Sequence, residues 1–274
     1  MKGCPAHKTS KMLYEMGINF IELSGGEYCK DNLKKLKNLK NEVKFKVHNY
    51  FPPPNKPFVF NLCSPSKEIA KKSLDLAKKG INYAYELNST SYSFHAGFLI
   101  DPDINEIGKR VQKKTLYNRQ DSINIFIDRV NILSSYAKYS GVELMIENNV
   151  LSHNNYRTFN QNPFLMADSD EACYIMKNTP KNVNLLVDVA HLKVSYKSLS
   201  KKVEEFFKKT KKYIKAFHFS ENDGFSDTNE PFNSESWFWE YLIKDLDYYS
   251  IEVYDYKKEN VLQQYKLAKN FIKS

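Results

Sequence analysis

The chain has 274 residues, of which 42% are hydrophobic and 14% aromatic, so it can bury a large core and matches the usual size of an α/β barrel. No apolar run approaches the roughly 20 residues that a membrane-spanning helix needs, and the first residues lack the apolar region of a secretory signal. We therefore expect a soluble, cytoplasmic protein with no membrane partner. The four cysteines lie far apart without a C-x-x-C pair, which argues against a zinc ribbon or a disulfide framework.

The net charge of +9 raises the question of nucleic-acid binding. The lysines concentrate in helical-looking stretches at 30–46, 67–79 and 201–215, where a solvated helix face is the simpler explanation. Arginine, the better reader of phosphate and base edges, is scarce. We therefore expect nucleic acid to be a partner only under an alternative interpretation given below.

Seven apolar, strand-like runs alternate with segments of helical periodicity. The runs lie near residues 18–23, 44–48, 91–96, 142–147, 184–188, 214–219 and 249–254. Helices are expected at about 8–16, 66–79, 121–139, 169–176, 204–213, 235–243 and 258–272. The alternation predicts a parallel sheet, and the length predicts a single-domain (β/α)8 TIM barrel over residues 1–274. An eighth strand would have to come from Lys2, Gly3 and Cys4, and we expect it to be weak or irregular.

Four of these runs end in a side chain that can bind a metal ion. They are, in chain order, Glu147, Asp188, His218 and Glu252. In a parallel barrel the C-terminal ends of the strands meet on one face, where active sites gather. We therefore predict that the four side chains converge on one divalent cation, although each taken singly could be a salt-bridged or capping residue. An oxygen-rich set with one imidazole suits Mn, Mg, Co or Zn.

Three histidines extend this candidate site. His48 and His95 also end apolar runs, and they could hold a second ion if Glu147 bridges the two positions. Each could equally be a hydrogen-bonded core histidine. His191 follows Asp188 by three residues, so we expect it at the start of the next helix, facing a substrate oxygen or another ion.

The loops near these strand ends carry further candidates. Asp223 and Asp227 follow His218 in a glycine-containing loop, where turn chemistry and substrate contact are both reasonable. Long connections at 49–66 and 148–168 follow candidate ligands, and long loops on that face usually shape or cover a site. The sequence contains no glycine-rich phosphate loop, G-x-S-x-G elbow or Cys–His nucleophile pattern.

Together these segments resemble the xylose-isomerase-like barrel superfamily, which includes endonuclease IV and the sugar and sugar-phosphate isomerases and epimerases. The matching segments are His48-Asn49-Tyr50, Phe94-His95-Ala96-Gly97, Ile146-Glu147-Asn148, Val187-Asp188-Val189-Ala190-His191, Phe217 to Gly224, and Ile251-Glu252. They span roughly residues 18–255 in matching order. The resemblance implies a (β/α)8 barrel with a divalent metal site formed by Glu147, Asp188, His218 and Glu252.

The isomerase and epimerase branch implies a reaction through a metal-stabilised enediolate. In that branch, carboxylates that resemble Glu147 and Glu252 remove and return the proton next to the carbonyl, in addition to binding the metal. His191 resembles the histidine that contacts a substrate hydroxyl, and we place Asp223, Asp227 and Asn229 with it as candidate substrate-binding residues. Epimerases of free ketohexoses carry an arginine where Gly224 stands, so the identity of the sugar stays open.

The endonuclease IV branch implies a zinc phosphodiesterase, such as an abasic-site endonuclease. Its first zinc site resembles His48, His95 and Glu147. Its third site would use His191, Asp227 and a histidine at the position of Asn229, where an amide is a poor zinc ligand. A barrel that retains its ligands but only binds a molecule is a third hypothesis.

We therefore predict a metal-dependent isomerase or epimerase of a small sugar or sugar phosphate. The sequence leaves open the substrate, the identity and number of metal ions, the formation of a homo-oligomer, and whether the loop after His48 covers the site.

Overall fold

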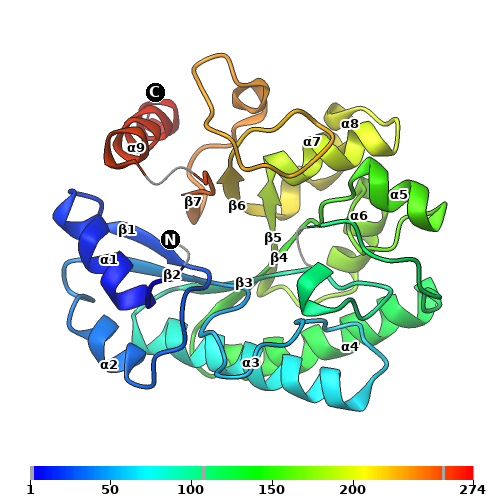
Figure 1. The fold of residues 1–274 in the computed structure, drawn as a ribbon, viewed down its shortest axis with the longest axis horizontal. Helices are drawn as coiled ribbons and strands as arrows, with labels where there is room; N and C mark the ends of the chain where they lie inside the picture. The colour runs from blue at the N-terminus through cyan, green and yellow to red at the C-terminus, as the bar shows by residue number, and fades with distance from the viewer. Residues whose placement is uncertain (1–2, 107–108, 255–256, 274) are drawn as a thin grey trace.

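The structure is a computed structural model that describes residues 3–106, 109–254 and 257–273. In this part of the chain, seven parallel strands form one sheet in sequence order that curls into a nearly closed barrel, with the helices outside it (Figure 1). The strands are β1 (Phe20–Leu23), β2 (Lys44–His48), β3 (Ser91–His95), β4 (Glu143–Glu147), β5 (Val183–Asp188), β6 (Ile214–Phe219) and β7 (Tyr248–Ile251). Each strand starts within two residues of the start of a predicted run, and the predicted parallel barrel is confirmed.

The helices follow the strands in the alternation that the sequence predicts. The α-helices are α1 (Ala6–Glu15), α2 (Asn32–Lys37), α3 (Lys67–Glu86), α4 (Arg119–Lys138), α5 (His153–Phe159), α6 (Ser169–Lys177), α7 (Val189–Ser198), α8 (Val203–Thr210) and α9 (Lys258–Lys273). Short 3-10 helices are η1 (Ile104–Glu106), η2 (Lys211–Tyr213) and η3 (Trp237–Tyr241). None of the described helices is long and apolar enough to span a bilayer.

One predicted helix has a different form. The segment at 235–243 is only the 3-10 helix η3, because its aromatic side chains pack against separate neighbours. Phe238 stacks on Phe219, and Trp239 stacks on Phe271, with ring centroids 5.2 and 4.2 Å apart. These tertiary contacts outweigh the helical periodicity of the segment.

The expected eighth strand is absent from the described residues at the N-terminus. Gly3 forms a turn at φ +76° and Cys4 a bend, while Lys2 lies outside the described residues. The left-handed backbone at Gly3 and the missing N–H of Pro5 both oppose an extended, hydrogen-bonded segment. Strands β1 and β7 therefore remain the two edges of the described sheet.

The interior of the barrel is layered. A buried apolar layer of Met145, Leu186, Ala216 and Tyr248 fills its middle. At the N-terminal end of the strands, Lys46 Nζ lies 2.6 Å from Asp247 Oδ2. The outward-facing residues of the strands instead join the larger apolar core beneath the helices. Because the apolar layer separates the two polar ends, charged residues at the C-terminal ends of the strands form a separate site.

Candidate metal centre

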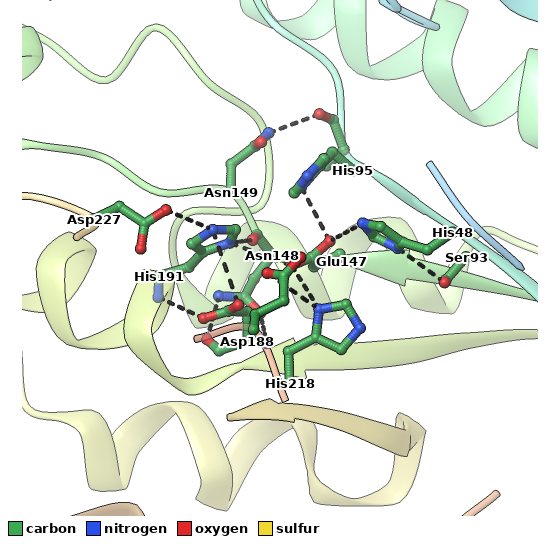
Figure 2. A network of polar contacts seen from close by, with 12 residues as sticks. His48, Ser93, His95, Glu147, Asn148, Asn149, Asp188, His191, His218 and Asp227 are labelled. Carbon is green, nitrogen blue, oxygen red and sulfur yellow. Dashed lines mark hydrogen bonds and ion pairs between the residues drawn. The ribbon is translucent and has the colours of Figure 1, made fainter. Parts of the chain in front are cut away.

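The carboxylate of Glu147, at the end of β4, lies among four imidazoles (Figure 2). Its Oε2 is 3.3 Å from Nε2 of His48 and 3.1 Å from Nδ1 of His95. Its Oε1 is 3.4 Å from Nδ1 of His191 and 3.5 Å from Nδ1 of His218. Glu147 is completely buried, so its charge interacts with these imidazoles with little screening by water.

The four residues predicted to share one cation come together here. Glu147, Asp188, His218 and Glu252 each offer a ligand atom, and these atoms all lie within 4.8 Å of one another. Glu252 Oε2 is 3.6 Å from His218 Nδ1. Strand pairing explains the convergence, since Asp188 on β5 is directly beside His218 on β6.

Several polar atoms of these residues lack a hydrogen-bond partner within the described part of the chain, as expected for the ligands of a cation. Both carboxylate oxygens of Glu147, Oδ2 of Asp188 and both ring nitrogens of His218 are buried without an aligned hydrogen bond among the described residues. Buried polar atoms without partners are costly, and buried charges are normally paired or bound to metal. A divalent cation among these carboxylates and the imidazole would satisfy several of them at once.

A second group shares Glu147. His48, His95 and Glu147 also bring one ligand atom each within 4.8 Å of the others. Nδ1 of His48 lies 3.0 Å from Oγ of Ser93, and the hydroxyl of Tyr248 donates a hydrogen bond of 2.9 Å to the same Oγ. These contacts from inside the barrel hold His48 with Nε2 directed at Glu147.

Glu22 is a member of the cluster that the sequence analysis missed. It lies in the middle of β1, and its Oε2 is 2.9 Å from Nε2 of His218. The neighbouring residues Ile21 and Leu23 belong to the apolar core, so Glu22 points the other way, into the barrel. The signal in the sequence is a charged residue between two apolar ones inside a strand-like run, whereas the predicted ligands all lie at the ends of such runs.

His191 lies beside the cluster, at the start of α7. Its Nδ1 is 3.0 Å from the carbonyl oxygen of Asn148, which can only accept a hydrogen bond. Its Nε2 is 3.2 Å from Oδ2 of Asp227, and its backbone N–H caps the helix on Asp188 Oδ1. The structure thus brings His191 and Asp227 together at the edge of the site (Figure 2).

The two other candidate substrate-binding residues lie in the same loop. Asp223 is exposed, and its Oδ1 accepts hydrogen bonds from the backbone N–H groups of Phe225 and Ser226, as in an Asx turn. Asn229 is buried at φ +51°, and its carbonyl oxygen accepts a hydrogen bond from the N–H of Tyr254. A substrate contact for Asp223 or Asn229 stays a prediction.

Two consecutive asparagines, Asn148 and Asn149, tie the strand ends together, although neither is among the predicted site residues. The Asn148 side chain accepts from the N–H of Asp188 and donates to its carbonyl oxygen, at 2.8 and 3.1 Å. The Asn149 amide donates to the carbonyl oxygens of Ala96, Gly97 and Leu165. These bonds fix the ends of β3, β4 and β5 relative to one another, and hence the ligands that they carry.

Comparison with known proteins agrees with this architecture. A family model described as a xylose isomerase-like TIM barrel matches residues 11–273. The chain belongs to this family. No curated protein sequence matches this xylose isomerase-like barrel.

Solved structures with the same fold cover nearly the whole chain. A D-tagatose 3-epimerase-like protein is 17% identical, with a TM-score of 0.72 over 99% of this chain and 97% of its own. D-psicose 3-epimerase with D-tagatose from Clostridium cellulolyticum H10 is 12% identical, with a TM-score of 0.66 over 97% and 93%. The TTHB071 protein from Thermus thermophilus, soaked with ZnCl2, is 16% identical, with a TM-score of 0.58 over 98% of both chains.

Opposite charges set the protonation of two carboxyl groups in this xylose isomerase-like barrel. Burial would raise the pKa of Glu147, but His95, His48 and His218 hold it well below its usual range. Burial would also raise the pKa of Glu252, but His218 lowers it to about 2. Both groups are therefore carboxylates at neutral pH, which is the form that binds a cation or accepts a proton.

Asp188 differs because carboxylates surround it. Burial, together with the nearby carboxylates of Glu147, Glu252 and Asp227, raises its pKa to about 8 against the opposing effect of His191. Burial lowers the pKa of His95 to about 4 despite Glu147, so this imidazole is neutral and has a lone pair for a ligand. The xylose isomerase-like barrel thus retains a proton on Asp188 where carboxylates crowd together.

Proposed function

We propose that this protein is a metal-dependent isomerase or epimerase of a small sugar or sugar derivative. The observation that carries the proposal is the convergence of Glu147, Asp188, His218 and Glu252, the first three of which have buried polar atoms without a hydrogen-bond partner among the described residues. The family match and the epimerases among the proteins of the same fold are consistent with this chemistry. The substrate class is therefore a polyhydroxy carbonyl compound, with a C–H bond next to its carbonyl group.

The proposed reaction is a proton transfer at the carbon next to the carbonyl. A divalent cation held by the four ligands would polarise adjacent substrate oxygens and so make that C–H bond more acidic. Glu252, whose side chain is 24% exposed, faces the accessible side of the cluster and accepts the proton from carbon. Glu147 is the partner carboxylate. In epimerisation it takes up a proton from solvent and delivers it to the opposite face, and Glu252 then releases its own proton to solvent. In isomerisation the proton held on Glu252 is returned to the neighbouring carbon.

His191 and Asp227 would orient the substrate. Nδ1 of His191 is directed at a carbonyl oxygen and Nε2 at Asp227, and a substrate hydroxyl would enter at the edge of the site and accept from Nε2 in place of Asp227. Asp227, 3.2 Å from this nitrogen, can accept a hydrogen bond from a second hydroxyl. A sugar offers adjacent hydroxyls at the spacing that such a pair can bind.

Exchange of carbon-bound hydrogen in D2O tests this proposal. Protein loaded with Mn2+ or Co2+ would be incubated with a panel of ketoses, aldoses and their phosphates, and NMR would follow deuterium at carbon together with new isomers. Glu252→Gln should lower the rate by about 10²–10⁴-fold, as expected for a lost general base. Glu143→Gln is the matched control, because Glu143 lies on the same strand as Glu147 but is exposed at the opposite end.

Hydrogen exchange at carbon and the metal content of the protein together decide whether the proposal holds. Exchange that depends on Glu252 and on the metal, and is retained in Glu143→Gln, supports the proposal. A fully metal-loaded protein that neither exchanges hydrogen nor interconverts any sugar in the panel would overturn it and favour a barrel that only binds its ligand.

A second candidate is a zinc phosphodiesterase, favoured by the group His48, His95 and Glu147. Two ions bridged by Glu147 could activate a water molecule and polarise a phosphate. In that case elemental analysis would find two or more zinc ions per chain, and His48→Ala would lose one. Cleavage of an abasic-site duplex that disappears in His95→Ala would support this function, whereas inactivity on DNA and simple phosphodiesters would exclude it.

A further inference from the structure

The side chain of Glu22 reaches His218 from the opposite edge of the sheet. Glu22 lies on β1, which is one edge of the described sheet, and His218 lies on β6, next to the other edge strand β7. Oε2 of Glu22 is 2.9 Å from Nε2 of His218, and the two side chains are 7% and 0% exposed. The contact therefore connects β1 to β6 across the seam where the described residues form no strand pairing.

The two nitrogens of His218 face different groups. Nδ1 lies 3.5 Å from Oε1 of Glu147 and 3.6 Å from Oε2 of Glu252, while Nε2 faces Glu22. A neutral imidazole carries its proton on one nitrogen only, and a ligating nitrogen must carry none. If Nδ1 binds the cation, the proton must be on Nε2, directly beside a carboxylate that can accept it.

We infer that Glu22 is a positioning residue for the metal centre: its carboxylate accepts the Nε2–H of His218 and so holds Nδ1 in the form and direction that bind the cation. This inference depends on the metal site of the proposed function, but not on the reaction at that site. The Nε2–Oε2 contact has the length of a hydrogen bond. Carboxylates that orient metal-binding histidines in this way are common partners of metal ligands.

The position of Glu22 argues against it as a ligand of an ion bound at Nδ1. Such an ion would lie on the side of the His218 ring that faces Glu147 and Glu252, whereas Glu22 faces the other nitrogen, Nε2. The 2.9 Å between Nε2 and Oε2 has the length of a direct N–H···O contact.

His48, which also lies near Glu22, likewise argues against a cation bound by Glu22. Glu22, His48 and His218 lie close enough to be considered as a separate metal-binding group. Both nitrogens of His48 are already directed elsewhere, since Nδ1 lies 3.0 Å from Ser93 and Nε2 lies 3.3 Å from Glu147. In this group, His48 therefore faces Glu147 and Ser93 rather than a cation beside Glu22.

Metal binding by four proteins tests the inference: the wild type, Glu22→Gln, Glu22→Asp and the control Glu143→Gln. Calorimetry with Co2+ gives the number of ions and the affinity, and urea unfolding of the chelated proteins reports folding separately. Glu22→Gln should bind Co2+ about 10–100-fold more weakly with an unchanged number of ions. Glu143→Gln should bind as the wild type does.

Histidine side-chain ¹⁵N NMR of the Zn2+-loaded proteins adds a readout that a purely structural role would not change. The wild type should show His218 protonated at Nε2, and this signal should shift in Glu22→Gln. If Glu22→Gln fails to fold, Glu22→Asp serves instead, because it keeps the charge but withdraws it from the ring.

Two results would overturn the inference. Wild-type Co2+ affinity in folded Glu22→Gln would show that Glu22 does not support His218. Loss of a whole ion from this variant at saturating Co2+ would show that Glu22 is itself a ligand. Both results would leave the proposed sugar reaction standing, because hydrogen exchange on the substrate is measured independently.

Discussion

At the residue scale, the cluster around Glu147 places more negative charge in the barrel than its histidines neutralise. Three of its carboxyl groups, Glu147, Asp188 and Glu252, come within 4.8 Å of one another. Without a cation, the arrangement is stabilised by protons, which is why the pKa of Asp188 is raised to about 8. A cation that binds these carboxylates must displace such protons, so metal binding and pH are linked.

This linkage predicts a pH dependence for the chelated protein. The pKa of Asp188 is raised from its ordinary value of 3.8 to about 8 in the folded state. The contribution of Asp188 to the free energy of unfolding is therefore complete below pH 3.8, and it is lost as the pH rises through 8. Burial lowers the pKa values of His191 and His218, but nearby carboxylates raise both well above 6.5, so they act in the same direction. Chelated protein should therefore melt at a lower temperature at about pH 8.5 than at about pH 6.

Added metal should stabilise the protein more at about pH 8.5 than at about pH 6, and so oppose the fall in melting temperature. The apparent affinity should rise about tenfold per pH unit for each proton that the ion displaces below pH 8. Melting curves with Mn2+ or with a chelator, at both pH values, measure the effect as the metal-dependent rise in Tm. An equal rise at the two pH values would contradict the proton displacement.

At the element scale, the asparagines after β4 hold the strand ends in place. The Asn149 amide donates to the carbonyl oxygens of Ala96, Gly97 and Leu165, which belong to the segments that follow β3 and β4. Removing this amide takes the donor from the carbonyl oxygens of the buried residues Ala96 and Leu165, which is costly, whereas the carbonyl oxygen of Gly97 still accepts from the N–H of Leu165.

Asn149→Ala should therefore destabilise the protein by about 1–3 kcal/mol. It should also weaken Co2+ binding, because Glu147 is two residues away. Urea unfolding and calorimetry measure the two effects. Asn154→Ala is the control, since Asn154 is exposed on α5 and its replacement should change stability by less than about 0.5 kcal/mol. Stability of Asn149→Ala equal to that of the control would refute the role of this amide.

At the scale of the whole molecule, the two ends of the barrel have different tasks. The C-terminal ends of the strands carry the metal-ligand cluster, and the apolar layer of Met145, Leu186, Ala216 and Tyr248 separates it from the other end. There Lys46 contacts Asp247, Thr90 and Ser91 at 2.6, 2.6 and 3.2 Å. In barrels of this kind, residues at the N-terminal face usually serve stability rather than activity.

Lys46→Met should thus reduce stability without changing the metal centre. The side chains of Lys46 and Asp247 are 19% and 28% exposed, so we expect a loss of about 1–2 kcal/mol after allowing for solvent screening. Lys215→Met is the control, because Lys215 is an exposed strand lysine on β6. Urea unfolding should separate the two variants, and both should bind Co2+ as the wild type does. Weaker Co2+ binding in Lys46→Met would show that the two ends are coupled.

The seven strands, the parallel barrel and the residues at the strand ends all follow from the local pattern of the sequence. Apolar runs that alternate with helical periodicity specify strands and helices locally, and parallel strands place their C-terminal ends on one face. The tertiary structure alone decided which other side chains meet these residues. Glu22 and His218 are 196 positions apart, and Ser93 and Tyr248 are 155 apart, so no local pattern relates them.

Tertiary structure also decided where the local patterns fail. The aromatic residues of η3 follow their packing partners rather than a helical repeat, and the segment at Gly3 turns instead of forming a strand. Burial, pKa and the choice of hydrogen-bond partner depend on atoms brought together from distant strands. Sequence periodicity specifies the direction of a side chain within its own element, whereas its partners depend on how the barrel closes.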